Sequence, residues 1–451
     1  MANETQDLTK GHLGKQILLF SLPLMLSNLL QVLFNMADIA VVGQFAGSTA
    51  LGAVGSTTTL VTLFTGALIG LSAGINVLVA LHIGSKNSKA VRETVHSAAF
   101  FSLLIGLLIL GIGAVFSKTI LSVMNTKPEL IGDATLYLRI YFLGMPALAI
   151  YNFGNAVFSA VGDTKRPLRY LTIAGILNLI LNLFFVIVCK LSVAGVAIAS
   201  AISQYVSAFL ILNALCRSKE DYGLNLRDMH IRRDKLLAIV RIGVPAAMQN
   251  VIFQFANLFV QVGVNSFDAI TVAGNSAAAN ADGLVYDVMA AFYTACGSFI
   301  GQNYGAHNKK RILKSYFISL AYSFTAGLTL GLLLLTFCHA FLGLFTKDAA
   351  VIEAGMYRLT VMSLSYAISA FMDSTIAASR GLGETLVPTF IVIMGSCVFR
   401  VIWIYTVFAY FHTITSLYLL YCISWTITAI AEIIYFIYLY RKNVSKLPVH
   451  I

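Results

Sequence analysis

The sequence is poor in charged residues. Only 11% of its 451 residues are Asp, Glu, Lys or Arg, and 58% are hydrophobic. A soluble domain carries roughly 25% charged residues, so this chain has too little polar surface to cover a water-soluble globule of its size. A transmembrane barrel would show short alternating segments rather than long apolar ones. The composition therefore predicts an all-α integral membrane protein.

Paired cysteines and nucleotide-binding motifs are also missing. The six cysteines are scattered in or beside apolar stretches and none forms a C-x-x-C pair, so neither zinc nor a disulfide framework is indicated. The sequence has no Walker loop, no H-E-x-x-H motif and no Rossmann glycine pattern. These absences exclude an ATP-driven pump and a metal-dependent membrane protease. We expect no cofactor, and any driving energy must come from an ion gradient.

The chain is instead rich in long apolar stretches, and membrane-spanning helices need about 20 such residues. Most of the 30 Lys and Arg residues fall in segments on one side of these stretches, which places both termini in the cytoplasm of a cell-membrane protein. The net charge of +11 then reflects topology and contact with the lipid bilayer, and no nucleic-acid partner is expected. Twelve spans are predicted, near residues 16–44, 51–82, 92–116, 131–158, 167–188, 193–216, 236–265, 270–302, 311–341, 352–381, 387–411 and 414–440.

The second half of the chain repeats the first. Matched residues are Gly, Pro, Asn and Lys, which similarity in apolar composition alone would not align. The repeat predicts two pseudo-symmetric six-helix lobes, residues 1–216 and 242–451, joined by a cytoplasmic linker over 217–241. Duplicated bundles are the usual construction of transporters that alternate access. The pairs include Pro23 with Pro245, Asn28 with Asn250, Asn35 with Asn257, Gly84 with Gly305, Asn87 with Asn308, Lys89 with Lys310, Gly162 with Gly383, Thr164 with Thr385 and Pro167 with Pro388.

Asp38 is the only carboxylate deep within a span of the first lobe, since Glu93 and Asp133 lie at the ends of theirs. It lies about two turns from the outer end of its helix, and Asn182 and Ser200 lie at similar depth in the fifth and sixth spans. Asn178 is one turn from Asn182 on the same helix face. We expect these four residues to converge as an ion-coupling site that holds a proton or, if the ion is Na⁺, has Asp38 as a metal ligand. The alternative is that Asp38 meets water and the amides hold helices together.

The second lobe carries more charge at membrane depth, where charge is costly and usually functional. Asp282, Asp287 and Asp373 are predicted to form a polar network with Arg400. By depth, Asp373 or Asp287 is the expected partner of Arg400, either as a structural ion pair or as a coupling pair. The functional interpretation of Glu432 and Asp282 is weaker, because either can also be a hydrogen-bonded residue that packs between helices.

The chain resembles the multidrug and toxic compound extrusion (MATE) family over essentially its whole length. Each motif that carries the resemblance is weak alone, but they occur in order and in both halves. They are Asn35-x-x-Asp38-x-x-x-Val42-Gly43, Ala50-Leu51-Gly52-Ala53-Val54-Gly55, Gly162-Asp163-Thr164-x-x-Pro167, Val193-Ala194-Gly195-Val196-Ala197-Ile198-Ala199-Ser200 and Arg380-Gly381-Leu382-Gly383-Glu384.

The resemblance implies efflux of bulky, amphipathic and often cationic compounds in exchange for H⁺ or Na⁺. In the branch resembling DNA-damage-inducible protein F, the ion site contains residues matching Asp38 and Asn178. Two positions depart from that branch, because Asn182 stands where Asp is common and Ser200 where Thr is common. Phe253-Gln254 stands near the span-7 Glu of the Na⁺-coupled branch, so that second-lobe site is not expected.

The preferred hypothesis is a monomeric, cation-coupled antiporter acting on small amphipathic organic substrates. The main alternative is a flippase for a lipid-linked precursor, which would need a cationic cavity for a pyrophosphate head group. A membrane receptor or membrane enzyme is less favoured, because no catalytic constellation is present and a receptor does not need duplicated halves.

Overall fold

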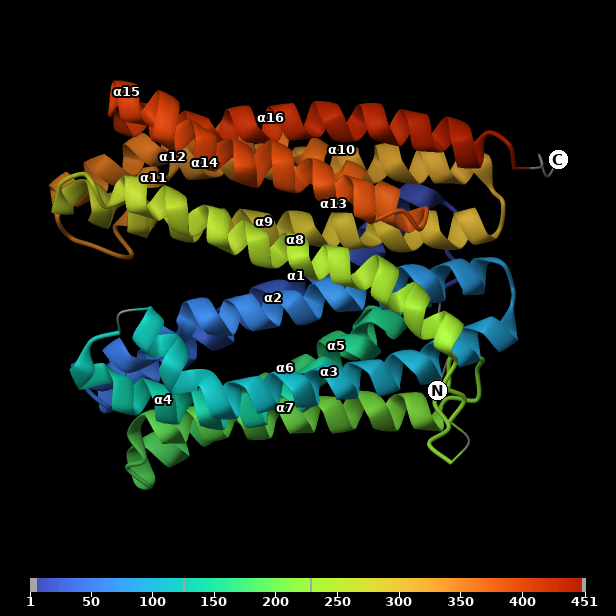
Figure 1. Cartoon of the computed structure of the whole chain (residues 1–451), viewed down its shortest axis with the longest axis horizontal. Helices are drawn as coiled ribbons and strands as arrows, with labels where there is room; N and C mark the ends of the chain where they lie inside the picture. The colour runs from blue at the N-terminus through green and yellow to red at the C-terminus, as the bar shows by residue number, and fades with distance from the viewer. Residues whose placement is uncertain (1–5, 125, 228, 448–451) are drawn as a thin grey trace. The chain divides into compact units, whose positions relative to one another are not determined.

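The computed structural model describes residues 6–124, 126–227 and 229–447, and nearly all of them are helical (Figure 1). Eleven helical segments of this described chain are long and apolar enough to cross a membrane. The pair α4 and α5, bent by 46°, supplies a twelfth if it counts as one span. The prediction of an all-α protein with twelve membrane spans is thus confirmed.

The first half of the chain contains eight helical elements. They are α1 (Leu13–Phe45), α2 (Ser48–Gly84), α3 (Ser88–Val123), α4 (Pro128–Leu143), α5 (Met145–Ala160), α6 (Lys165–Leu183), the π-helical turn η1 (Phe184–Val188) and α7 (Ser192–Arg217). The predicted span 131–158 is the bent pair α4–α5. The bend lies at Gly144 and Pro146, where proline removes a backbone donor and favours the start of a new helix.

The second half follows the same order with more interruptions. It contains α8 (Arg233–Val264), α9 (Ala269–Gly305), α10 (Lys309–Thr336), α11 (Cys338–Leu342), α12 (Ala349–Gly381), α13 (Leu386–Val392), η2 (Ile393–Val398), α14 (Phe399–Trp403), η3 (Ile404–Phe408), α15 (Ala409–Phe411), α16 (Ile414–Leu439) and η4 (Tyr440–Val444). The elements from α13 to α15 form one continuous span, Leu386–Phe411, with two π-helical turns within it.

Apolar side chains on the outer helix faces support the membrane assignment. On α3, Leu103, Leu104, Leu107 and Leu108 repeat at helical spacing and are 43–56% exposed. Such a continuous apolar face is unfavourable in water and matches lipid chains. The core lies on the opposite faces of the helices.

Contacts divide the chain into two compact units. Among the described residues, unit 1 comprises residue 6 and those between 26 and 244, and unit 2 comprises residues 7–25 and 245–447. These bounds differ from the predicted 1–216, 217–241 and 242–451, because the first part of α1 belongs to unit 2 and the first part of α8 to unit 1. Both helices change unit next to a proline, Pro23 or Pro245.

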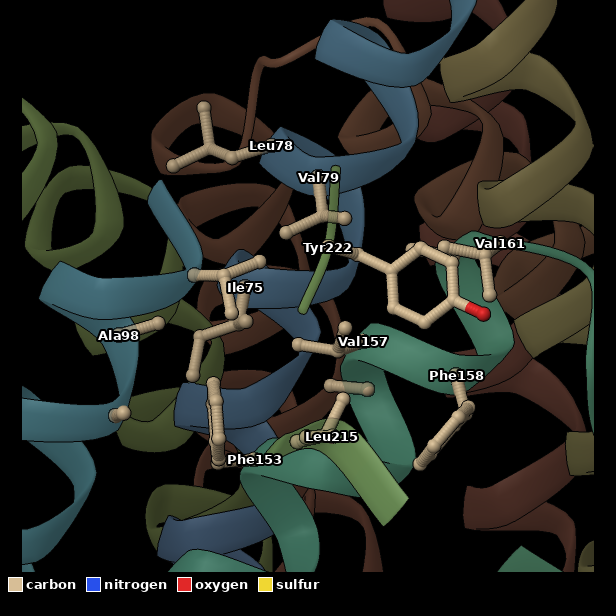
Figure 2. Packing of buried hydrophobic residues seen from close by; sticks show 14 of the residues in the cluster. Ile75, Leu78, Val79, Ala98, Phe153, Val157, Phe158, Val161, Leu215 and Tyr222 are labelled. Carbon is tan, nitrogen blue, oxygen red and sulfur yellow. The ribbon is translucent and has the colours of Figure 1, made fainter. Parts of the chain in front are cut away.

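The segment between α7 and α8 packs as part of unit 1. Tyr222 and Leu224 are almost fully buried, and the Tyr222 ring centroid lies 6.2 Å from that of Phe158. Figure 2 shows the Tyr222 ring among Val157, Phe158 and Val161, which come from the end of α5 and the residue after it. The predicted linker is therefore anchored by its own apolar side chains.

In unit 2, the segment before α1 is held by hydrogen bonds. The guanidinium of Arg311 at the start of α10 donates to the backbone carbonyls of Leu8, Lys10 and Gly11 at 3.1, 3.1 and 2.8 Å. Further along, the rings of Phe20 and Phe299 meet edge to face at 5.5 Å. These contacts explain why residues 7–25 belong to this unit.

The residues that carry the sequence repeat are largely turn and capping residues. The Asn87 side chain accepts from the Ala90 N–H at the start of α3, and Asn308 accepts in the same way from Arg311 at the start of α10. Gly162 and Gly383 have φ of 85° and 86°, in the left-handed region that favours glycine. The repeat thus preserves helix starts and turns rather than a duplicated binding site.

Candidate functional site

The structure brings all four predicted first-lobe residues together. The Asn182 amide donates to one carboxylate oxygen of Asp38, and the Ser200 hydroxyl donates to the other at 3.3 Å. Asn182 also donates to the Asn178 side-chain oxygen at 3.1 Å, and Asn178 donates to Ser200 Oγ at 3.3 Å. The cluster joins α1, α6 and α7 within unit 1.

A close helix crossing places Asp38 against α6. A Cβ atom on Gly175 would lie only 1.8 Å from the Phe34 ring, so α1 and α6 can approach this closely only because residue 175 is glycine. Asp38 follows Phe34 by one helical turn, while Asn178 and Asn182 follow Gly175 by about one and two turns. The same crossing therefore sets both sides of the cluster. A π-helical turn, a feature frequent at functional sites, starts two residues after Asn182.

The cluster has one ionisable group, Asp38, and one side-chain oxygen, that of Asn182, which accepts no hydrogen bond. Asn178, Asn182 and Ser200 are at most 7% exposed, and the side-chain oxygen of Asn182 has no hydrogen-bond partner. A single negative charge surrounded by amide and hydroxyl oxygens can be neutralised by one proton or by a hard monovalent cation. No group of three His, Cys, Asp or Glu residues within the described chain could hold a transition metal.

The site has no counterpart of the same chemistry in the second half. At an offset of 222, Val260 stands in place of Asp38, and at 221 or 222 the positions matching Asn182 are Trp403 and Ile404. Those matching Ser200 are Tyr421 and Cys422. The repeat kept the helices and changed the polar side chains, so only unit 1 carries this arrangement among the described residues.

Asp282 has a partner that the sequence did not reveal. It forms an ion pair with Arg358 of α12 and accepts a hydrogen bond from the Tyr366 hydroxyl. Arg358 is only 3% exposed and also donates to the Asn275 side-chain oxygen at 2.5 Å. Arg358 was not among the residues of the predicted second-lobe network, because it lies near the start of the predicted span 352–381.

Arg400 does not have the carboxylate partner predicted for it. Instead of Asp373 or Asp287, its guanidinium donates to Asn257 at 2.9 Å and to Ser424 at 3.4 Å. Its Cζ lies 5.1 Å from the ring centroid of Phe253 and 4.6 Å from that of Tyr421. Two aromatic faces and two neutral acceptors thus surround the charge, and cation–π attraction takes the role expected for an ion pair.

In the described part of the chain, no ion pair joins Arg400 to Asp287 or Asp373. Asp287 is half-buried on α9. Asp373 is half-buried on α12, where the charge that acts on it is that of Arg380. Of the three carboxylates in the predicted network with Arg400, only Asp282 acts on it electrostatically, so Asp373 and Asp287 are not joined to it. Depth along a helix gave the height of each residue but not the direction in which it points.

Comparison with known proteins decides the family. The family model described as MatE matches residues 23–184 and again residues 245–406, one match in each half of the repeat. The chain belongs to the MATE family.

Curated relatives of this MATE protein are bacterial transporters. It is 32% identical over 313 residues, 68% of each chain, to a probable multidrug resistance protein, YpnP, of Bacillus subtilis. It is 25% identical over 390 residues to a probable multidrug resistance protein, NorM, of Thermotoga maritima, covering 84% of this chain and 82% of that one. It is 26% identical over 373 residues to an FAD transporter of Shewanella oneidensis, covering 80% and 81%.

Solved structures confirm the MATE fold. A transporter of the MOP superfamily from Pyrococcus furiosus superposes with a TM-score of 0.90 at 22% identity over 98% of each chain. An outward-facing multidrug resistance MATE transporter gives a TM-score of 0.90 at 23% identity over 99% of each chain. At these identities the likeness shows the fold alone. The predictions that the chain is a multi-pass MATE transporter and not an enzyme are confirmed by its family, while its placement in the branch of DNA-damage-inducible protein F stays a prediction.

Proposed function

We propose that this MATE protein is an antiporter that exports small amphipathic, often cationic, compounds from the cytoplasm in exchange for H⁺ or Na⁺. The multidrug resistance and multidrug export proteins among its relatives support the substrate class. The single observation that carries ion coupling is the convergence of Asn178, Asn182 and Ser200 on Asp38.

The proposed coupling follows from the cost of charge at membrane depth. An ionised carboxylate there is unfavourable by roughly 2.5–3.5 kcal/mol on insertion scales, and a bound proton or Na⁺ removes that charge. The neutral and ionised forms of Asp38 then favour different packing of α1 against α6 and α7. Ion and substrate need not touch, because each can bias the same two-state bundle.

The charges within the spans of unit 2 do not by themselves favour cationic cargo. Asp282 is already neutralised by Arg358, and Arg380 is a further, half-buried cation. The preference for cations therefore depends on the relatives. A transport assay with a cationic dye and an anionic flavin, with the proton and sodium gradients collapsed separately, tests both cargo and coupling. Flavin export without dye export would overturn the proposed substrate class.

Asn182→Asp is expected to keep transport but change its ion dependence. The substitution puts a second carboxyl against Asp38, and two adjacent carboxyls hold a proton between them or present more charge to Na⁺. Proton-driven transport should then persist to higher pH, or sodium-driven transport should saturate at lower sodium concentration. Dye efflux from vesicles, measured against pH and sodium, checks this.

The matched control for this substitution is Asn225→Asp, which adds the same charge at an exposed position between α7 and α8. It should leave both profiles unchanged. An Asn182→Asp protein with wild-type pH and sodium profiles would remove Asn182 from the ion site.

Both termini are proposed to be cytoplasmic, on the basis of the Lys and Arg distribution. In a protein freed of its six native cysteines, a cysteine at Leu226, which is 63% exposed, should be labelled only when the cytoplasmic side is accessible. A cysteine at Leu344, 79% exposed in the segment before α12, should be labelled from outside. The reverse pattern in intact cells would invert the topology.

A further inference from the structure

Glu432 carries a buried carboxyl group without a hydrogen-bond partner. It lies on α16, is fully buried, and neither of its side-chain oxygens has a hydrogen-bond partner. Burying an unpaired carboxylate costs several kcal/mol even after relaxation of the surroundings. Ala429 and Phe436, one turn to either side on α16, are themselves buried and apolar. The surroundings therefore suit a neutral carboxyl and not a carboxylate.

The charged groups that act on Glu432 are Arg380 and Asp373, both on the neighbouring helix α12. Tyr435, three residues further along α16, also interacts electrostatically with Glu432. Neither carboxyl forms an ion pair with Arg380 among the described residues; the guanidinium donates to Gln249 at 2.8 Å, and its Nε has no acceptor. One cation thus faces two carboxyls, and a single proton makes the group electrically neutral.

The difference in burial assigns that proton to Glu432. Asp373 is half-buried, so its ionised form keeps some hydration, whereas Glu432 is completely enclosed. The less hydrated of two coupled carboxyls is the one that stays protonated. No cavity is needed, because the ligand is a proton.

We propose that Glu432 is a second proton-binding group, located in unit 2, which releases and regains its proton during the transport cycle. This inference rests on the proposed antiport function, because release and uptake of the proton during transport presuppose an ion-coupled cycle. It makes the number of coupling ions larger than the single charge at Asp38 would give.

Arg380 supplies the second state that such a cycle needs. With Glu432 protonated, the guanidinium is engaged by Gln249, as observed. When Glu432 loses its proton, the free Nε of Arg380 is the available donor for the new carboxylate. The gain of Glu432 as a further acceptor for the Arg380 guanidinium links protonation to the packing of α12 against α16.

Infrared difference spectroscopy of the purified, reconstituted protein tests the proposal, because only a protonated carboxyl gives the carboxylic-acid C=O band. Wild type, Glu432→Gln and Asp38→Asn are compared while pH is raised, and again on adding an exported cationic dye at fixed pH. The expected result is a band lost in Glu432→Gln, retained in Asp38→Asn, and diminished in wild type by alkali and by dye. A band unchanged in Glu432→Gln, or one that responds to neither pH nor dye, would overturn the proposal.

Stability gives an independent readout. Gln has the shape of a protonated Glu, so Glu432→Gln should unfold at the wild-type temperature at neutral pH. A marked loss of thermal stability would instead reveal a structural carboxylate and also overturn the proposal. Asp38→Asn separates the two hypotheses: continued transport by that variant together with a Glu432 band refutes first-lobe coupling and leaves proton binding at Glu432 standing.

Discussion

Asp38→Asn is expected to abolish gradient-driven export while leaving a folded protein in the membrane. Asparagine fills the same volume, and its oxygen can accept from Asn182 while its NH2 donates to the Ser200 hydroxyl, so α1, α6 and α7 should stay packed. It can neither take up a proton nor offer a negative charge to Na⁺. The ion then has no differential affinity for the two states of the bundle, and its gradient cannot drive export.

The measurement is efflux of a cationic dye from cells or vesicles against a concentration gradient. Expression, gel filtration and thermal stability should match wild type, and the exposed carboxylate Glu129 on α4 gives the control variant Glu129→Gln. Downhill dye movement through Asp38→Asn is compatible with the mechanism. Pumping at the wild-type rate against a gradient is not, and would require first-lobe coupling to be abandoned.

The first-lobe cluster could be predicted because several sequence signals agreed. Asp38 was the only intramembrane carboxylate of its half, and Asn178 and Asn182 shared one helix face. The residue that makes the approach possible, Gly175, gave no signal, because its importance depends on the Phe34 ring that the fold places against it. A close approach depends on the facing residues of two helices, and the sequence does not show which residue of another helix faces Gly175.

The second-lobe pairing failed for a different reason. Position along a helix gives only the depth of a residue in the membrane, and by depth Asp373 and Asp287 were the candidate partners of Arg400. Rotation about the helix axis decides contacts, and it directs Arg400 toward Asn257 and Tyr421. The sequence shows Asn257 as the repeat partner of Asn35. Nothing in the sequence favours a neutral amide over a carboxylate as the partner of a buried cation.

The domain bounds followed chain order, which is the simplest reading of a repeat. The contacts instead assign the start of α1 to unit 2 and the start of α8 to unit 1. The repeat itself contains this exchange symmetrically, since Pro23 and Pro245 mark it in both halves. Nothing in the periodicity of an apolar helix indicates which bundle its first turns pack against.

Asp282→Asn is expected to cause the largest loss of stability among single substitutions of charged residues in unit 2. Arg358 is almost completely buried, whereas the Asp282 side chain is 33% exposed. Removing the negative charge therefore leaves a buried cation with neutral partners alone, which are the new amide, Asn275 and the rings of Tyr418 and Tyr421. Losing one partner of a buried pair typically costs about 3–5 kcal/mol. Arg358→Gln should cost less, because the Asp282 carboxylate left behind still reaches solvent.

Thermal unfolding and folded yield in detergent measure the effect. The double variant Asp282→Asn with Arg358→Gln should recover part of the loss, because neither charge is then left alone; coupling of about 0.5–3 kcal/mol is usual for groups in contact. Glu353→Gln is the matched control, an exposed carboxylate on the same helix as Arg358, and should change little. Strictly additive losses in the double variant would show that Asp282 and Arg358 stabilise the bundle independently, despite the ion pair between them.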